Sequence, residues 1–302
     1  MLREPLLREE QFSVSLIKEE MSVRELLRWA VKTLESLGPD EASASAERLL
    51  TEVIGCRKHD LYLCGEEAVS SSAVSRYQDF IRFRKERVPV AYILGFTEFW
   101  DEKISVRPGC LIPRPETECL IEAVLRINRW SPKDSFDILD LAAGSGAVGI
   151  SLLRLFPKAN AVFSDLSNLS LEMVRENLNR YSLLNRAQIV QSDLFQSLFP
   201  QKWDVIVSNP PYLSKKDMGQ LQPELKYEPA EALYGGEDGL EFYRKISGTA
   251  GSYLKFEGCL ILEVGQGQAG EVCRMLQQKG LTVFETVKDS LGIDRVISAR
   301  KA

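Results

Sequence analysis

Short apolar runs alternate with helical segments from residue 136 to the end of the chain, and this alternation restricts the fold more than any other property of the sequence. Runs rich in β-branched residues and bounded by turn residues indicate buried strands. Strands that alternate with helices form a parallel, doubly wound sheet, so we expect an α/β domain. The expected strands are Phe136–Leu141, Ala161–Ser164, Gln188–Val190, Trp203–Val207 and Cys259–Val264, the expected helices lie near Ala147–Leu155, Leu171–Leu183, Gly239–Tyr253 and Ala269–Lys279, and a final antiparallel hairpin joins Thr282–Glu285 to Arg295–Ala299.

The region before this alternation has the pattern of a small helical bundle. A helix start is predicted at Ser22, apolar residues follow at helical spacing to Leu37, and Gly38-Pro39 ends the pattern. Further helices are expected over residues 44–54, 58–63 and 71–86. Residues 1–20 carry mixed charge and no clear helix cap, so we expect a loosely held extension, and Met21 is a candidate alternative start.

Residues 88–108 are rich in β-branched and aromatic side chains, with Gly95 between two such stretches. This pattern predicts a β-hairpin that links two domains. The predicted division of the chain is an extension over residues 1–20, a helical domain over 21–87, a hairpin linker over 88–108 and an α/β domain over 109–302.

Composition restricts the class of protein and its compartment. Of the 302 residues 44% are hydrophobic, which is ample for a buried core, and the formal net charge of −5 argues against a broad phosphate-binding surface. No apolar run approaches the length of a membrane span and the first residues lack the apolar core of a signal peptide, so we expect a cytoplasmic protein. Six cysteines without a Cys-x-x-Cys pair and a single histidine, His59, argue against a structural zinc site and against histidine-based catalysis.

The apolar run Val205–Val207 leads to a turn with the sequence Asn209-Pro210-Pro211-Tyr212. Proline donates no N–H to a sheet and therefore stops a strand, and the carboxyl ends of strands in an open α/β sheet form the ligand crevice. The Asn209 side chain and the carbonyls of Asn209 and Pro210 offer both a donor and acceptors beside the Tyr212 ring, which suits a planar amide or an exocyclic amine. Taken alone, an ordinary strand-ending turn explains the same residues.

A glycine-rich loop follows the first strand, because residues 140–149 contain Gly-x-Gly-x-x-Gly. This motif alone is a weak signal for a dinucleotide at a helix N-terminus. Asp140 would repel a pyrophosphate, but it suits the amino group of S-adenosylmethionine, directly or through water. Asp165 ends the second strand and suits ribose hydroxyls, and Asp193 ends the third strand where an adenine amino group is expected. Each acid alone fits a cap or a solvated loop, but acids at three successive strand ends favour S-adenosylmethionine.

With the Asn-Pro-Pro-Tyr turn, the arrangement resembles the amino methyltransferases that act on planar nitrogen, and in particular the release-factor glutamine methyltransferases called HemK or PrmC. The resemblance covers nearly the whole chain from about Ser22. The helical N-terminal region contributes to it, and the remaining segments that carry it are Pro89–Gly95 with Glu98–Trp100, Ile112–Glu118, Asn209–Tyr212, Tyr227–Pro229 with Ala232–Gly239, and Glu263–Gly265.

The resemblance implies a Rossmann-like, seven-stranded class I methyltransferase domain behind a helical substrate-recognition domain. It implies transfer of a methyl group from S-adenosylmethionine to the side-chain amide nitrogen (N5) of the glutamine in the Gly-Gly-Gln motif of class I peptide-chain release factors, which leaves S-adenosylhomocysteine and supports translation termination. We expect a monomer that needs no metal and binds no nucleic acid directly.

The resemblance also implies the site residues. The cofactor is expected to contact Asp140, Ala142, Ala143, Gly144, Ser145, Gly146, Asp165, Asp193, Leu194 and Asn209. Asn209, Pro210, Pro211 and Tyr212 are expected to bind the substrate, with Asn209, Pro210 and Tyr212 in the catalytic roles. The family usually has Gly then Thr where this chain has Ala142-Ala143, and often an aromatic residue where it has Leu194. We interpret both departures as small changes in the contacts to the cofactor, because neither removes a charged contact.

Three other functions compete with this interpretation. An adenine or cytosine amino methyltransferase would use the same Asn-Pro-Pro-Tyr frame. That interpretation predicts a recognition domain with basic and aromatic character. In the first 90 residues, however, the Arg and Lys residues are nearly matched in number by acids, so no basic face is evident. A non-catalytic protein with a decayed site is disfavoured by the intact Asp140, Asp165, Asp193 and Asn209. A nicotinamide-dependent dehydrogenase is the third alternative, and binding tests with a nicotinamide cofactor and with S-adenosylmethionine would distinguish it from a methyltransferase.

Overall fold

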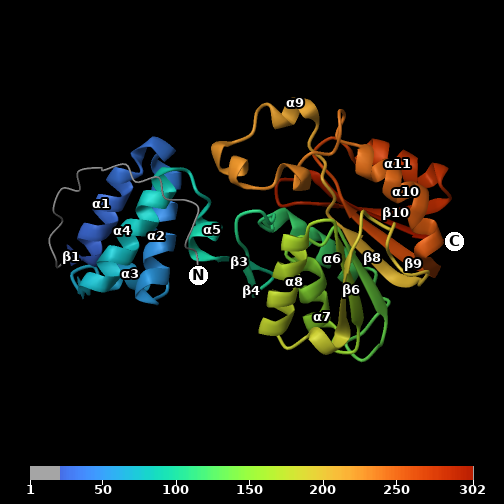
Figure 1. The fold of residues 1–302 in the computed structure, drawn as a ribbon, viewed down its shortest axis with the longest axis horizontal. Helices are drawn as coiled ribbons and strands as arrows, with labels where there is room; N and C mark the ends of the chain where they lie inside the picture. Colours follow the sequence, from blue (N-terminus) through green and yellow to red (C-terminus); the bar gives the residue numbers. More distant parts are fainter. Residues whose placement is uncertain (1–20, 302) are drawn as a thin grey trace. The chain divides into compact units, whose positions relative to one another are not determined.

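The computed structural model describes residues 21–301 and divides the chain into two compact units, Met1–Val90 and Ala91–Ala302 (Figure 1). The predicted extension over residues 1–20 lies outside the described residues. Among the helices of residues 21–301, none is long and apolar enough to cross a membrane.

The first unit is a helical bundle whose first helix starts where the sequence predicts. The Ser22 hydroxyl accepts a hydrogen bond from the Glu25 N–H at 3.3 Å, and the Glu25 carboxylate accepts one from the Ser22 N–H at 2.8 Å, which completes a capping box. The second helix starts at Pro39 rather than Ala44, because proline is well suited to the first position of a helix. The elements are β1 (Met21–Ser22), α1 (Val23–Thr33), η1 (Glu35–Leu37), α2 (Pro39–Ile54), α3 (Asp60–Leu63), β2 (Ala68–Val69) and α4 (Ser71–Lys85), with β1 and β2 paired antiparallel.

The expected hairpin between the two domains is partly wrong. Val90–Leu94 forms helix α5, and the hairpin consists only of β3 (Phe96–Phe99) and β4 (Glu102–Ser105). Five apolar residues are too few for their periodicity to separate a buried helix from a strand. Gly95 ends α5 with a φ of +82°, which is a conformation that favours glycine.

The second unit contains a seven-stranded sheet, part of which is labelled in Figure 1. The strand order is β10-β11-β9-β8-β5-β6-β7. Strands β5 to β9 pair in parallel, and β11 runs antiparallel to both of its neighbours. The strands are β5 (Asp137–Leu141), β6 (Asn160–Asp165), β7 (Ala187–Gln191), β8 (Trp203–Ser208), β9 (Leu254–Glu263), β10 (Leu281–Lys288) and β11 (Asp294–Lys301), which confirms every predicted strand of the α/β domain.

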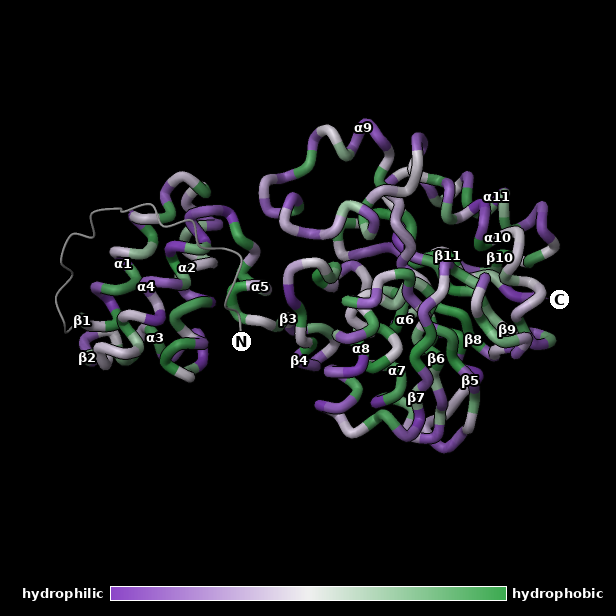
Figure 2. Tube along the Cα trace, viewed as in Figure 1, coloured by the Kyte–Doolittle hydropathy of each residue, from purple (hydrophilic) through white to green (hydrophobic). Residues whose placement is uncertain are grey.

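Helices cover both faces of this sheet. Leu139 and Leu141 of β5 join the core beneath α10 (Glu241–Tyr253) and α11 (Ala269–Gln278). The intervening side chains of β5 alternate to the face that α6 (Glu118–Arg126), α7 (Ala147–Leu155) and α8 (Asn168–Arg180) cover. Figure 2 shows the central strands as mostly hydrophobic and the segment around α9 (Lys215–Met218) as hydrophilic. The remaining short helices are η2 (Pro115–Thr117), η3 (Leu184–Arg186), η4 (Pro223–Tyr227) and η5 (Ala230–Ala232).

Candidate active site

A cavity of about 250 Å³ opens where the carboxyl ends of β5, β6, β7 and β8 meet. Strand β5 precedes the others in the chain and lies between β6 and β8, so the sheet order reverses here, which is where ligands bind in open α/β sheets. The cavity is lined by Leu111, Ala142, Gly144, Asp165, Leu166, Ser167, Ser170, Ser192, Asp193, Leu194, Asn209, Pro211, Pro229, Glu231, Ala232 and Phe242.

The loop after β5 is held by two acids. Asp165, the last residue of β6, accepts the Gly144 N–H at 2.9 Å with one carboxylate oxygen and the Ser167 N–H at 2.8 Å with the other. A side chain at Gly144 would project into open space, so the backbone there is accessible from the cavity. Burial raises the pKa of Asp165, and backbone N–H donors oppose that shift. Each carboxylate oxygen keeps capacity for a further donor from a ligand.

Asp140 lies deeper, on the face of the sheet that α7 covers. Its carboxylate accepts the Gly149 N–H at 2.9 Å, and only 3% of the residue is exposed. Gly149 allows this approach, because a Cβ there would lie 2.8 Å from the Asp140 carboxylate and 2.4 Å from the Phe163 ring. Burial raises the pKa of Asp140 to about 7, the Gly149 N–H opposes the shift, and the charge of Asp165 adds to it.

Ala142 adopts a φ of +56°, in the left-handed region that favours glycine. We predict that Ala142→Gly raises the free energy of unfolding by about 0.5–1 kcal/mol, because relief of about 1–2 kcal/mol of backbone strain exceeds the added entropy of the unfolded chain. Denaturant unfolding measures the change. The matched control is Ala143→Gly, which lacks a positive φ and should lower the free energy of unfolding. Equal effects of both substitutions would contradict the prediction.

The Asn-Pro-Pro-Tyr turn starts directly after β8. The Asn209 Nδ2 group donates to the Thr117 Oγ1 atom at 3.1 Å, and no described residue donates to the Asn209 carboxamide oxygen. Asn209 and Pro211 line the cavity, whereas Pro210 is buried and is not among the lining residues. Tyr212 is half-buried against the core, and burial raises the pKa of its hydroxyl to about 12, with the charge of Glu263 adding to the shift.

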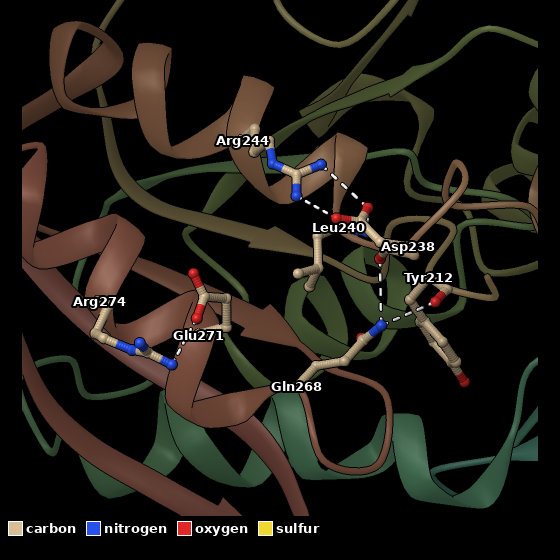
Figure 3. Close-up of polar contacts among 8 residues, drawn as sticks. Tyr212, Asp238, Leu240, Arg244, Gln268, Glu271 and Arg274 are labelled. Carbon is tan, nitrogen blue, oxygen red and sulfur yellow. Dashed lines mark hydrogen bonds and ion pairs between the residues drawn. The ribbon is translucent and has the colours of Figure 1, made fainter.

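Two glycines and one glutamine hold this turn, and Figure 3 shows the glutamine, Gln268, with its hydrogen bond to Tyr212. A Cβ at Gly235 would lie 2.7 Å from the Pro211 carbonyl oxygen, and one at Gly239 would lie 2.4 Å from the Tyr212 carbonyl oxygen. The Gln268 amide donates to the carbonyls of Tyr212 at 3.0 Å and Gly239 at 3.2 Å. Its carboxamide oxygen accepts the Gly265 N–H at 3.0 Å, so one side chain joins three segments that are distant in sequence.

We predict that Gln268→Glu lowers the turnover number about tenfold and the free energy of unfolding by about 1–3 kcal/mol. A carboxylate has no N–H to donate, so the carbonyls of Tyr212 and Gly239 lose their donor and face a negative charge. Steady-state kinetics and thermal unfolding measure the two effects. The exposed Gln266→Glu is the matched control, and similar behaviour of the two variants would show that the hydrogen bonds of Gln268 are unimportant.

The wall opposite the strand ends is anchored by a buried acid. Glu228, whose side chain is 1% exposed, forms an ion pair with Arg114 and accepts the Ile112 N–H at 3.0 Å. The segment before α6 is thereby joined to the segment that carries Pro229 and Glu231, which line the cavity. Two of the segments that carry the resemblance thus form one side of the site.

The cavity brings together some of the predicted site residues and omits others. Ala142, Gly144, Asp165, Asp193, Leu194, Asn209 and Pro211 line it, and Asp140, Ala143, Ser145, Gly146, Pro210 and Tyr212 do not. Sequence reasoning missed Leu111, Leu166, Ser167, Ser170, Ser192, Pro229, Glu231, Ala232 and Phe242. Leu166 and Ser192 directly follow strand ends, so the strand pattern could have indicated that they line the cavity. The position of Phe242 at the cavity depends on how α10 packs, which the sequence pattern does not contain.

The residues present fit an adenosyl ligand. Asp165 and Asp193 supply carboxylates for hydroxyl and amino donors, Leu194 and Phe242 supply aliphatic and aromatic faces, and the open backbone at Gly144 permits close approach. Among residues 21–301, no group of three or more His, Cys, Asp or Glu side chains is placed to hold a metal ion.

The sheet order, the antiparallel β11 and the acid-lined cavity at the switch point define a class I S-adenosylmethionine-dependent methyltransferase fold. The family profile for the PrmC N-terminal domain matches residues 25–95, and that for the methyltransferase small domain matches residues 117–234. The release factor glutamine methyltransferase of Geobacter sulfurreducens is 35% identical over 92% of this chain and 96% of its own length. The chain belongs to the release factor glutamine methyltransferase family.

Two further similarities accompany this assignment. The release factor glutamine methyltransferase of Thermodesulfovibrio yellowstonii is 38% identical over 85% of this chain and 92% of its own length. A crystal structure of a release-factor-specific protein-(glutamine-N5) methyltransferase from Alicyclobacillus acidocaldarius is 29% identical, covers 65% of this chain and 98% of its own, and superposes with a TM-score of 0.39.

Proposed function

We propose that this chain methylates the side-chain amide nitrogen (N5) of the glutamine in the Gly-Gly-Gln motif of class I peptide-chain release factors. The observation that carries the proposal is the Asn-Pro-Pro-Tyr turn, of which Asn209 and Pro211 line the cavity, in a chain of this family. Its carboxamide oxygen and its rigid backbone offer hydrogen-bond acceptors to a planar amide, while the acids of the neighbouring strands suit the methyl donor.

S-adenosylmethionine, when bound, supplies an activated methyl group on its sulfonium. Asp165 would hold the ribose hydroxyls, Asp193 the adenine amino group and Leu194 one face of the ring. The backbone of residues 142–146 would lie along the methionine part, with the charge of Asp140 acting on its amino group directly or through water. Asn209 would contact both the cofactor and the substrate.

An amide nitrogen is a poor nucleophile, because its lone pair is delocalised into the carbonyl. The Asn209 carboxamide oxygen and the Pro210 carbonyl accept the two amide protons of the glutamine and direct its lone pair toward the methyl group. Tyr212 packs against the glutamine side chain. Such positioning supplies up to about 7–11 kcal/mol of barrier reduction, so no dedicated base is required and the proton leaves to water.

The helical unit is proposed to recognise the release factor. It carries two exposed apolar side chains on α3, Tyr62 at 62% and Leu63 at 83% exposure, which a protein partner can cover. Monomeric state, a cytoplasmic location and independence of metal ions and nucleic acid remain predictions.

The test is methyl transfer from labelled S-adenosylmethionine to a purified class I release factor. A copy with its Gly-Gly-Gln glutamine changed to alanine, and double-stranded DNA, are assayed beside it. We expect label on the intact factor alone. Label on DNA with none on the factor would mean that the turn binds a base, and the proposal would be wrong.

A further inference from the structure

Two residues of the segments that carry the resemblance have no role so far. Glu263 is the last residue of β9 and only 1% exposed, and one of its carboxylate oxygens has no hydrogen-bond partner among the described residues. Thr117 ends η2, immediately before α6, and is 4% exposed. A buried carboxylate with an unpartnered oxygen is costly, so its presence beside a catalytic turn requires an explanation.

The register of the sheet places Glu263 next to Asn209. Ser208 of β8 pairs with Leu262 of β9, and Asn209 and Glu263 are the residues that follow on the two strands. Leu260 and Leu262 belong to the core beneath α10 and α11, so the alternation of β9 directs Glu263 to the opposite face, where α6 packs. Thr117 stands at the start of that helix, where it accepts a hydrogen bond from Asn209 and lowers the pKa of Glu263.

The single hydroxyl proton of Thr117 determines the direction of the hydrogen bonds among Thr117, Asn209 and Glu263. A threonine hydroxyl has one proton to donate and two lone pairs. Its oxygen accepts the Asn209 Nδ2–H at 3.1 Å, so its single proton remains available to the Glu263 carboxylate, whose pKa Thr117 lowers. As long as Glu263 accepts, the Asn209 amide nitrogen faces Thr117, and the carboxamide oxygen faces the other way.

We propose that Thr117 and Glu263 are positioning residues that fix the orientation of the Asn209 side-chain amide and keep its oxygen turned toward the substrate. The inference rests on the proposed function in one respect only, namely which substrate group the Asn209 carboxamide oxygen binds. The orientation itself is a property of the free enzyme.

The charged and titratable groups around Glu263 determine the pH above which its carboxylate is ionised and accepts a hydrogen bond from Thr117. They come from every neighbouring element and comprise Arg114, Glu116, Cys119, Tyr212, Tyr243 and Arg295. Burial raises the pKa of Glu263 to about 7, hydrogen bonding from Thr117 and the charge of Arg295 oppose the shift, and Glu116 adds to it. Below about pH 7 the carboxyl carries its own proton and no longer forces Thr117 to donate.

The first experiment compares turnover and cofactor affinity in four variants. Thr117→Val keeps the shape but removes the hydroxyl, Glu263→Gln removes the charge, and Thr117→Ser restores the hydroxyl. Ser298→Ala is the control, because it removes a buried hydroxyl that has no hydrogen-bond partner among the described residues. We expect the first two variants to lose about tenfold to hundredfold in turnover with the cofactor Kd within about twofold of wild type, and Thr117→Ser and Ser298→Ala to stay within about threefold. Wild-type turnover in Thr117→Val would overturn the inference.

The pH profile tests the role of Glu263. At saturating cofactor and substrate, turnover of the wild type should rise with pH through about 7, as Glu263 loses its proton. Glu263→Gln cannot titrate and should lack this limb. The same limb in both proteins would show that another group titrates and would overturn the assignment to Glu263.

The third readout needs no substrate. The side-chain amide signals of Asn209 in the ¹⁵N-labelled free enzyme are identified by their loss in Asn209→Asp. We expect their hydrogen exchange to accelerate at least about tenfold in Thr117→Val and not in Ser298→Ala. Unchanged exchange would overturn the inference. If the exchange behaves as expected but the wild type does not methylate the release factor, the proposed function fails and the orientation stands.

Discussion

Asn209→Ala is expected to lower the turnover number by about a hundredfold while the affinity for S-adenosylmethionine falls far less. The substitution removes the carboxamide oxygen that accepts a substrate N–H, and loss of alignment at the reacting atoms alone can account for a factor of this size. The unpaired substrate amide adds about 1–3 kcal/mol to the free energy of binding. Single-turnover methyl transfer and equilibrium binding of the cofactor measure the two effects separately.

The control for this prediction is Asn179→Ala, on the exposed side of α8, which removes the same group away from the cavity. Thermal unfolding of both variants shows whether the fold is retained, since Asn209→Ala also loses the hydrogen bond to Thr117. Wild-type turnover in Asn209→Ala would refute the mechanism and leave the Pro210 carbonyl as the remaining acceptor of the turn.

Asp140→Asn is expected to stabilise the free protein at pH 8 and to weaken its binding of the cofactor. Burial holds the pKa of Asp140 at about 7 in the folded chain, against 3.8 for an ordinary aspartate. Between these values the folded chain binds more protons than the unfolded chain, so stability falls as the pH rises from about 4 to about 7. The ionised carboxylate thus lowers stability by up to about 4 kcal/mol at pH 8, and a neutral asparagine, with one new unpaired N–H, should recover about 1–3 kcal/mol.

Denaturant unfolding at pH 8 and pH 4.5 measures this gain, which should nearly vanish at the lower pH because the wild-type carboxyl is then neutral as well. Isothermal titration measures the cofactor Kd, which we expect to rise at least about tenfold as the negative charge is lost. Asn160→Ala, at the exposed amino end of β6, is the control. Unchanged affinity in Asp140→Asn would show that Asp140 only supports the loop through Gly149.

The parts of this site that could be predicted from the sequence lie at strand ends. Asp165, Asp193 and Asn209 each stand where a β-branched run stops, and parallel strands bring such positions to one edge of the sheet. Periodicity gave the correct type for every strand of the α/β domain and for the helices α7, α8, α10 and α11. It failed for Val90–Leu94, where five apolar residues fit either a helix or a strand and burial within the fold decided the outcome.

The residues that could not be predicted act across large distances in the sequence. Glu228 meets Ile112 and Arg114, and Thr117 meets Asn209, through contacts that no local pattern contains. The burial of Asp140 also depends on the packing of α7 against β5, so its raised pKa cannot be read from the Gly-x-Gly-x-x-Gly motif. Motif residues indicated where the site lies, and the tertiary contacts determined which atoms remain available to a ligand.

Because of Gln268, the geometry of the Asn-Pro-Pro-Tyr turn does not depend on the residues that form the cavity wall, although these two properties of an enzyme are often coupled. It secures the carbonyls of Tyr212 and Gly239 from outside the cavity, and no cavity-lining residue takes part in those hydrogen bonds. The walls formed by Glu231, Ala232 and Phe242 can therefore change without loosening the turn. Altered acceptance of synthetic methyl donors should accordingly be accessible to engineering at these three positions, while the geometry that presents the amide nitrogen is left intact.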